Sequence, residues 1–236
     1  MRRWRHRRAL RRVVAGLLLL GVAILAAAAG GVASLPSVGD APRRARAILR
    51  VHHERGPMVV PARLATAVIA TEDEHFDEDV VLNVATGIGR AGVAVLQGQA
   101  NPGGATIDQQ LAKALYGQRG GVLGMLRQIG LGVKLGASYS HHEILAMYLN
   151  VNYYGNGFWG VRQAAEGYFH TAPGRLSWAE AAMLAGLLQA PSAYDPLAHP
   201  AAARARQRHV LSQLVANRDL TAGQAAAAAR ARPPLG

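Results

Sequence analysis

The sequence predicts an all-α domain behind one N-terminal transmembrane helix. From residue 47 nearly to the end of the 236-residue chain, apolar residues recur at helical spacing, and no segment alternates polar and apolar residues as a strand would. Two Ser-x-x-Glu patterns, which begin at Ser140 and Ser177, are typical of helix capping boxes. The membrane helix is predicted by residues 13–35, which include no charged residue.

The N-terminal part combines a basic head, residues 1–12, with this uncharged stretch. As a helix the stretch would be roughly 35 Å long, enough for a hydrocarbon core of about 30 Å. Arginines precede it and none follows it directly, so the positive-inside rule predicts a single-pass protein of the cell membrane, with a cytoplasmic N-terminus and an extracytoplasmic domain. The alternative is a cleaved secretory signal, because Val32-Ala33-Ser34 offers the small residues of a cleavage site.

Composition narrows the possible function classes. The net charge is +12, and seven arginines lie in the basic head, so the rest of the chain carries a net charge of +5. That distribution argues against a protein that reads DNA grooves, and no nucleic-acid partner is expected. The chain has no cysteine, so disulfides, thiolate metal sites and a cysteine nucleophile are excluded.

After the membrane segment, residues 36–46 are interpreted as a short linker and residues 47–232 as one domain. A helix at residues 59–76 brings Glu72 near its C-terminal end. Residues 82–102 are rich in glycine with few charges, which predicts a mobile segment that could also touch the membrane surface.

The helix expected at residues 106–116 has an organised polar face. Thr106, Gln110 and Lys113 recur at i, i+4 and i+7, and Gln109 lies beside them. Such a face is often only the solvated side of an amphipathic helix. Here Gly103-Gly104 precedes it, and glycines let a ligand approach a helix N-terminus, whose free N–H groups favour anions.

The rest of the chain is predicted to be helical. In the helix at residues 122–137 four glycines each cost up to about 1 kcal/mol relative to alanine, so this helix needs tertiary support. The aromatic and glycine-rich turn at residues 153–160 either packs at a helix junction or stacks on a sugar. Glu143 and Glu180 are interpreted as cap partners rather than catalytic acids. The other helices are expected at residues 144–151, 161–169, 181–189, 201–217 and 221–232.

Glu72 is the best candidate for a general base. A base must lie within hydrogen-bond reach of the hydroxyl it deprotonates, and partial burial suits it to the task. Phe76, at i+4, shares its helix face and could supply an apolar wall. Gln110 and Lys113 could then hold a leaving group with charged oxygens, which is catalysis by positioning and electrostatics.

With these residues, the chain resembles the peptidoglycan glycosyltransferases, both the monofunctional membrane-anchored enzymes and the equivalent domain of class A penicillin-binding proteins. The family's first motif, Glu-Asp-x-x-Phe, matches residues 72–76, and its second, Gly-Gly-Ser-Thr-Ile-Thr-Gln-Gln-Leu-x-Lys, matches residues 103–113 except at Ala105 and Asp108. The similarity runs from about residue 42 to residue 232. Further matches lie at Arg90-Ala91, Glu143-Ile144-Leu145, Tyr148-Leu149-Asn150, Glu180-Ala181-Ala182 and Gln189-Ala190-Pro191-Ser192.

The resemblance implies a lysozyme-like all-α fold and a hexosyltransferase that polymerises a lipid-linked disaccharide-pentapeptide into glycan strands, with release of polyprenyl pyrophosphate. Glu72 would take the proton from the acceptor sugar's 4-hydroxyl. A divalent cation, Mg²⁺ or Mn²⁺, is a candidate cofactor. The implied partners are the lipid-linked peptidoglycan precursor, the membrane and cell-wall synthases. The expected substrate-binding residues are Asp73, Phe76, Thr106, Gln109, Gln110, Lys113, Arg127 and Gln128.

The chain departs from the family's third motif, Arg-Lys-x-x-Glu, which should fall on Gly124, Met125 and Gln128. Glutamine makes hydrogen bonds but carries no charge, so the second acidic group is missing. Arg127 lies one turn beyond Gly124 and could replace the lost arginine. The histidine and glycine that follow the family's first motif are Asp79 and Val81 here.

Three functions compete at this point. A working polymerase is favoured by Glu72 and the aligned polar face, and on this interpretation Gln128→Glu should raise turnover. A catalytically impaired homologue that binds the lipid-linked precursor or a cell-wall synthase as a scaffold is favoured by the loss at Gly124 and Gln128. A glycan hydrolase would need a second carboxylate roughly 5 to 9.5 Å from Glu72, for which Asp73 and Asp79 are the only close choices in sequence.

Overall fold

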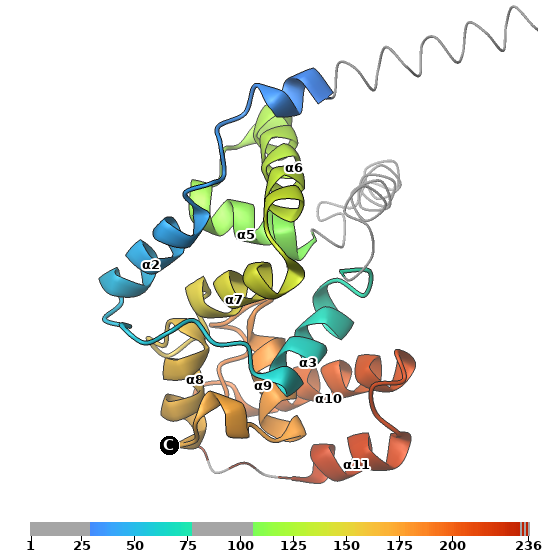
Figure 1. Cartoon of the computed structure of the whole chain (residues 1–236). Helices are drawn as coiled ribbons and strands as arrows, with labels where there is room; N and C mark the ends of the chain where they lie inside the picture. Colours follow the sequence, from blue (N-terminus) through green and yellow to red (C-terminus); the bar gives the residue numbers. More distant parts are fainter. Residues whose placement is uncertain (1–28, 77–105, 232, 234, 236) are drawn as a thin grey trace, which may run out of the picture. The chain divides into compact units, whose positions relative to one another are not determined.

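The computed structural model describes residues 29–76, 106–231, 233 and 235. Within these residues the fold is all-α, as predicted, and a single isolated bridge between Tyr153 and Trp159 is the nearest approach to a strand (Figure 1). The helices are α2 (Ala41–Val51), α3 (Ala62–Glu72), α5 (Ile107–Tyr116), α6 (Gly121–Ser138), α7 (His141–Val151), α8 (Gly160–Phe169), a 3₁₀ turn (Pro173–Arg175), α9 (Trp178–Leu187), α10 (Pro200–Ala216) and α11 (Ala222–Arg230).

The chain divides into two compact units, residues 1–37 and residues 38–236. Most of the predicted membrane helix, residues 13–28, lies outside the described residues, as do the glycine-rich residues 82–102 and Asp79. Residues 29–33, at the end of the uncharged stretch, are helical. In the part of the chain that the structure describes, no helix has the length and apolar character needed to span a bilayer.

Helix α2 corrects the expectation of a linker at residues 36–46, because the helix begins at Ala41. Its first-turn Pro42 is compatible with a helix start, since the missing N–H is not needed there. Ala41, Ala45 and Leu49 recur every four residues and are buried against α7 and α5. The arginines that suggested a linker lie on the exposed side of this amphipathic helix.

Helix α9 is the centre of the larger unit and packs against α3, α8, α10 and α11 (Figure 1). Its small residues allow close approach: a Cβ on Gly186 would lie 2.8 Å from Cγ of Arg206 in α10. Gln207 of α10 donates a hydrogen bond of 2.7 Å to the Ala179 carbonyl, which fixes α10 on α9. Helix α9 therefore sets the relative positions of α3 and α10.

Local signals explain where the helices begin. Both predicted capping boxes are present, Ser140 with Glu143 at α7 and Ser177 with Glu180 at α9. These glutamates accept hydrogen bonds from their cap backbones, which confirms that they are cap partners. Helix α5 begins after Thr106, whose hydroxyl accepts from the Gln109 N–H.

The aromatic turn at residues 153–160 packs at a helix junction. The Trp159 ring stacks on His52 at 3.7 Å between centroids, and Phe158 meets Tyr168 edge to face at 4.9 Å. Gly160 has a positive φ of 78°, and a Cβ there would lie 2.7 Å from the Asn150 carbonyl oxygen. The packing interpretation of these aromatics is therefore confirmed for Trp159 and Phe158.

Candidate active site

Glu72 is the last residue of α3, and its side chain is only 14% exposed. Its Oε2 accepts a hydrogen bond of 3.2 Å from Nε2 of Gln110 in α5. The Tyr148 hydroxyl of α7 donates to the other end of the same amide, at 2.8 Å from Oε1. Since Tyr148 occupies the amide oxygen, the NH₂ group of Gln110 is left to face the carboxylate.

Tyr148 is completely buried beneath this pair. Burial first, and then the charge of Glu72, raise the pKa of Tyr148 well above its usual range. Its hydroxyl therefore keeps its proton and remains a donor to Gln110. Three helices, α3, α5 and α7, thus hold Glu72 in one orientation.

Arg206 lies on the other side of the carboxylate, with Nη2 3.5 Å from Glu72 Oε1. Its side chain is only 11% exposed, and it comes from α10, 134 residues later in the chain. Arg206 was not predicted from the sequence, because the alternation of alanine and arginine in α10 gives no signal for one inward-facing arginine. Gly186 in α9 makes room for the aliphatic part of Arg206, but a single glycine in a helix does not by itself indicate an inward-facing arginine on another helix.

Asp73 connects the two segments that carry the first and second motifs. It is buried, with 5% exposed, and its Oδ2 accepts a 3.1 Å hydrogen bond from the Ile107 N–H. Thr106 is also buried and accepts from the Gln109 N–H. The N–H groups of Ile107 and Gln109, at the start of α5, are thus bonded within the protein. The sequence had predicted that N–H groups here would face a ligand anion.

Asp108 is a second buried carboxyl group at this helix start, 7% exposed, and its Oδ1 has no hydrogen-bond partner. Burial, followed by the negative charge of Asp73, raises the pKa of Asp108 to about 7. In the sequence, Asp108 stands out only as a departure from the family's second motif. Its burial is what makes it a titratable group near neutral pH.

The remaining predicted residues are spread around α5 and α6. Gln109 is buried, and its carbonyl accepts a 3.1 Å hydrogen bond from Gln128 Nε2. Arg127 donates to the Tyr116 carbonyl at 3.5 Å. Lys113 is exposed on α5, one turn beyond Gln110. These contacts join α5 to α6 and leave the ammonium of Lys113 at the surface.

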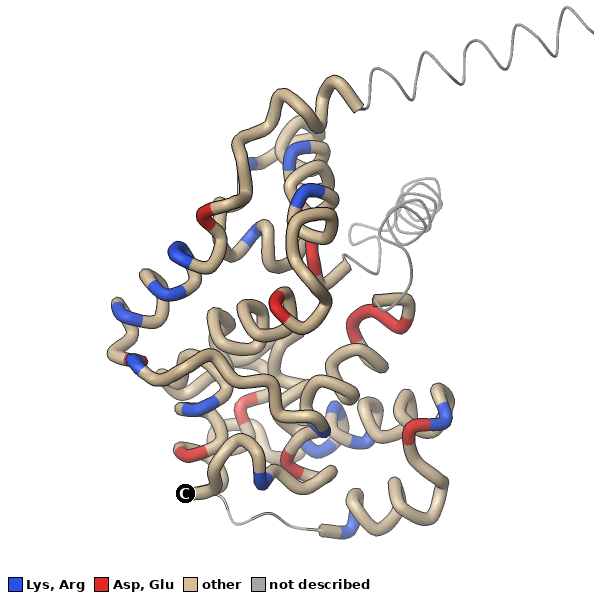
Figure 2. The backbone as a smooth tube through the Cα atoms, viewed as in Figure 1, with Lys and Arg blue, Asp and Glu red and all other residues tan. Residues whose placement is uncertain are grey.

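Phe76 is buried, with 2% exposed, and its ring lies 4.9 Å from the ring of His141 in α7. It therefore packs the turn after α3 against α7. Figure 2 shows the acidic positions gathered at the end of α3, where this turn begins.

The described residues include no group of three or more histidine, cysteine or acidic side chains placed to hold a metal ion. Asp73, one of the two carboxylates considered for a hydrolase, is buried and bonded to the α5 backbone. It is thus placed to join two helices, not to activate water beside a sugar.

The chain matches the family described as Transglycosylase over residues 49–215. It is 39% identical over 158 residues to penicillin-binding protein 2a of Streptococcus pneumoniae, covering 66% of this chain and 21% of that protein. It is 37% identical over 166 residues to penicillin-binding protein 1A of Neisseria gonorrhoeae, covering 70% and 21%. The chain thus spans about a fifth of the length of these penicillin-binding relatives.

A relative of similar size is a protein of Cupriavidus necator whose name describes it as a transglycosylase. The two are 36% identical over 205 residues, which cover 86% of this chain and 84% of that protein. Among solved structures, penicillin-binding protein 1A of Haemophilus influenzae aligns with a TM-score of 0.47 at 22% identity, over 78% of this chain and 18% of that one.

Proposed function

Because the chain belongs to the transglycosylase family, the peptidoglycan glycosyltransferases, we propose that it polymerises a lipid-linked disaccharide-pentapeptide into glycan strands. The observation that carries the proposal is the arrangement of Glu72, held by Gln110 on one oxygen and by Arg206 on the other. A largely buried carboxylate with both oxygens anchored, but not saturated, is suited to receive a proton from a hydroxyl.

The proposed reaction begins with proton transfer from the 4-hydroxyl of the acceptor sugar to Glu72. The acceptor oxygen attacks the anomeric carbon of the donor with inversion, and the bond to the polyprenyl pyrophosphate breaks. Among the described residues, one contact is made to each Glu72 oxygen, by Gln110 and by Arg206, and an oxygen has two lone pairs, so a position remains for the incoming proton. Gln110 and Tyr148 keep the carboxylate oriented through the transfer.

The leaving pyrophosphate needs positive charge, which we assign to Lys113 and Arg206. Lys113 is exposed on the same helix as Gln110, and an exposed ammonium can follow a departing anion. Thr106, Gln109 and Asp73 are buried, so their proposed contribution is to hold the start of α5 in place. The substrate's polyprenyl chain fits a protein anchored in the cell membrane by residues 13–35, with its domain outside the cytoplasm.

A second candidate function is a scaffold that binds the lipid-linked precursor, or a cell-wall synthase, without turnover. Two observations favour it. The Gln128 amide is bonded to the Gln109 carbonyl, and a Cβ on Gly124 would collide with the Arg119 carbonyl. The third motif's arginine and glutamate thus have no counterpart at these positions.

The experiment that separates the two uses the full chain in detergent with labelled lipid-linked disaccharide, with and without Mg²⁺ or Mn²⁺. The wild type should make polymer, and Glu72→Gln should lower the rate by roughly 10² to 10⁴, the usual contribution of a general base. Glu74→Gln, at a half-exposed position two residues away, is the matched control and should leave the rate unchanged.

Polymer made by Glu72→Gln at the wild-type rate would refute the assignment of the base. Substrate binding by the wild type without any product, across cations and pH, would favour the scaffold.

A further inference from the structure

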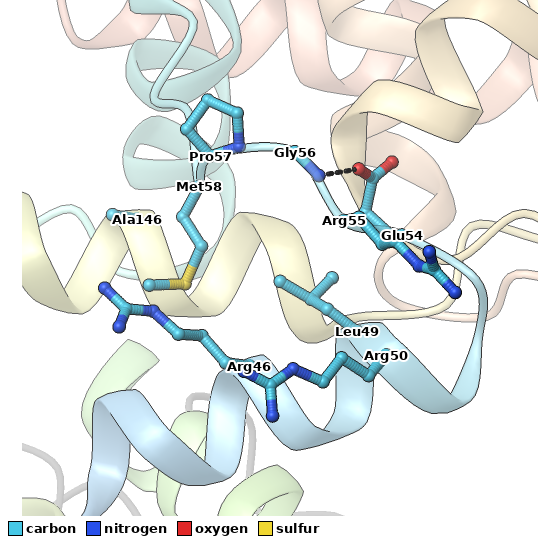
Figure 3. Close-up of a pocket in the computed structure, with 9 residues that line it drawn as sticks. All are labelled: Arg46, Leu49, Arg50, Glu54, Arg55, Gly56, Pro57, Met58 and Ala146. Carbon is cyan, nitrogen blue, oxygen red and sulfur yellow. Dashed lines mark hydrogen bonds between the residues drawn. The ribbon is translucent and has the colours of Figure 1, made fainter.

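A hollow lies away from Glu72, between α2 and the segment that joins α2 to α3. It has a volume of about 820 Å³, within the range of small-molecule sites. Figure 3 shows Arg46 and Arg50 on the α2 side and Met58 reaching toward them from the connecting segment. The hollow is lined by Arg46, Leu49, Arg50, Glu54, Arg55, Gly56, Pro57, Met58 and Ala146.

The hollow and the Glu72 site lie on different sides of α7. Ala146 lines the hollow, whereas Tyr148 bonds Gln110 at the Glu72 site. Residues that are two positions apart in an α-helix differ by about 200° around its axis, so the side chains of Ala146 and Tyr148 point in nearly opposite directions. The hollow is therefore not part of the site proposed for glycan polymerisation.

The walls of the hollow are fixed by contacts within the protein. The Asn150 side chain donates to the Val59 carbonyl at 2.8 Å and holds the connecting segment on α7. The Gly56 N–H donates to Glu54 Oε1 at 2.7 Å, drawn as the dashed line in Figure 3. A Cβ on Gly56 would lie 2.8 Å from Nε of Arg162 in α8, so the guanidinium packs directly against this glycine.

The acidic residue in the lining is already neutralised. Glu54 is 10% exposed, and its Oε1 lies 3.6 Å from Nε of Arg162. By contrast, Arg46, Arg50 and Arg55 are exposed arginines of the lining. Their side chains form no hydrogen bond or ion pair with another described residue. Arg46 and Arg50 thus bring two guanidiniums to the α2 side of the hollow, whereas Figure 3 shows the Arg55 side chain directed away from them, on the side of Glu54. Figure 2 shows basic positions gathered along α2.

We propose that this hollow binds a phosphate-bearing anion through Arg46 and Arg50. A guanidinium presents its N–H groups as a planar fork that matches phosphate oxygens. A phosphate or diphosphate offers enough oxygens and charge for two such forks, whereas one carboxylate carries a single charge and two oxygens. Leu49 and Met58 add an apolar wall for the organic part of the ligand.

The phosphate could belong to the headgroup of an anionic phospholipid or to a soluble diphosphate. Arg46 follows the uncharged stretch 13–35 by eleven residues, which would keep the hollow near a membrane surface if that stretch is inserted. The two sources share the same recognition chemistry and differ in what accompanies the phosphate.

The test is calorimetric titration of the full chain in detergent with inorganic pyrophosphate, dihexanoyl phosphatidylglycerol and dihexanoyl phosphatidylcholine. Arg46→Gln with Arg50→Gln should weaken the binding of whichever anionic probe, pyrophosphate or phosphatidylglycerol, the wild type binds, by about tenfold or more. The matched control is Arg43→Gln with Arg208→Gln, which removes the same charge at exposed positions outside the hollow and should change the affinity less than about twofold.

A second variant tests the hollow itself without changing charge. Ala146→Met should narrow the hollow from α7 and weaken binding, whereas Ala201→Met, at an exposed position, should not. Circular dichroism is the check that each variant is folded.

Hollow-dependent binding of phosphatidylglycerol would identify a lipid headgroup, and hollow-dependent binding of pyrophosphate alone would identify a soluble phosphate. The proposal is overturned if neither pyrophosphate nor phosphatidylglycerol binds the wild type. It is also overturned if the zwitterionic phosphatidylcholine binds as well as the anionic phosphatidylglycerol, or if the two double variants lose affinity equally.

Discussion

Glu72 and Arg206 form a charge pair that sequence spacing could not reveal. Each side chain is nearly nine-tenths buried, and each oxygen of the carboxylate has a different partner. Breaking a buried ion pair by removing one partner is costly, because the remaining charge keeps its desolvation penalty.

We expect Arg206→Gln to lower the free energy of unfolding by roughly 1 to 3 kcal/mol, less than for a fully buried pair because water reaches both groups. The variant should also slow polymerisation, since it removes positive charge beside the carboxylate. Urea denaturation and the polymerisation assay measure the two effects. Arg208→Gln, exposed on the same helix, is the control, and equal behaviour of the two variants would contradict the role given to Arg206.

Asp108 predicts a pH dependence of stability. Its pKa is about 7 in the folded protein and near 3.8 when unfolded, so between these values the native state binds more protons than the unfolded state. Stability should therefore fall as pH rises from about 4 to about 7. Asp108→Asn should flatten that slope and be more stable than the wild type at pH 8 by roughly 2 to 4 kcal/mol.

The measurement is the free energy of unfolding in urea at several pH values. Superimposable pH profiles for the wild type and Asp108→Asn would show that this carboxyl group is not buried in solution.

At the scale of elements, the contact of α5 with α6 explains Gly132 of α6. A Cβ on Gly132 would lie 3.0 Å from Gln109 Cγ and 3.1 Å from its backbone nitrogen. The residue that costs helix propensity thus permits a close approach of the two helices. This is the tertiary support that the glycine-rich sequence of α6 requires.

The same contact reverses an expectation drawn from the third motif. Gln128 donates to the Gln109 carbonyl, and a glutamate cannot donate when it is ionised. We therefore expect Gln128→Glu to lower stability by roughly 1 to 3 kcal/mol and not to raise turnover. Thermal unfolding and the polymerisation rate check this, with the isosteric Gln128→Met as a control for loss of the hydrogen bond without added charge.

A gain of turnover in Gln128→Glu, with stability intact, would show that the site still accommodates the family's second carboxylate.

At the scale of the whole molecule, the two units suggest that the larger one folds alone. Residues 38–236 form one compact unit, and Val38 is a buried anchor at its start. The Val38 carbonyl accepts hydrogen bonds from the hydroxyls of Tyr116, at 3.3 Å, and Tyr139, at 2.9 Å. The start of the unit is thus tied to α5 and to the end of α6.

A chain that begins at residue 37 should therefore be helical and unfold cooperatively, with a midpoint within a few degrees of the full chain's. Circular dichroism during heating measures this. A chain that begins at residue 41, without Val38 and Asp40, should unfold at a lower temperature, because both tyrosine contacts are lost. A non-cooperative transition for the chain that begins at residue 37 would contradict the division.

Local sequence patterns predicted most of the helices, their capping boxes and the position of Glu72 near a helix end. These features depend on residues three or four positions apart, so periodicity and cap chemistry are enough to read them. The same local rules misread α2 as a linker, because its apolar stripe of Ala41, Ala45 and Leu49 is narrow and its arginines are conspicuous.

Which side chains meet across the molecule depends on how the helices pack. Arg206 reaches Glu72 across 134 residues, and Asp73 bonds the start of α5 across 34. The raised pKa of Asp108 likewise comes from burial and from its neighbour Asp73. The physical reason is common to all three: distance and desolvation depend on how helices pack, and no local pattern in the sequence encodes either one.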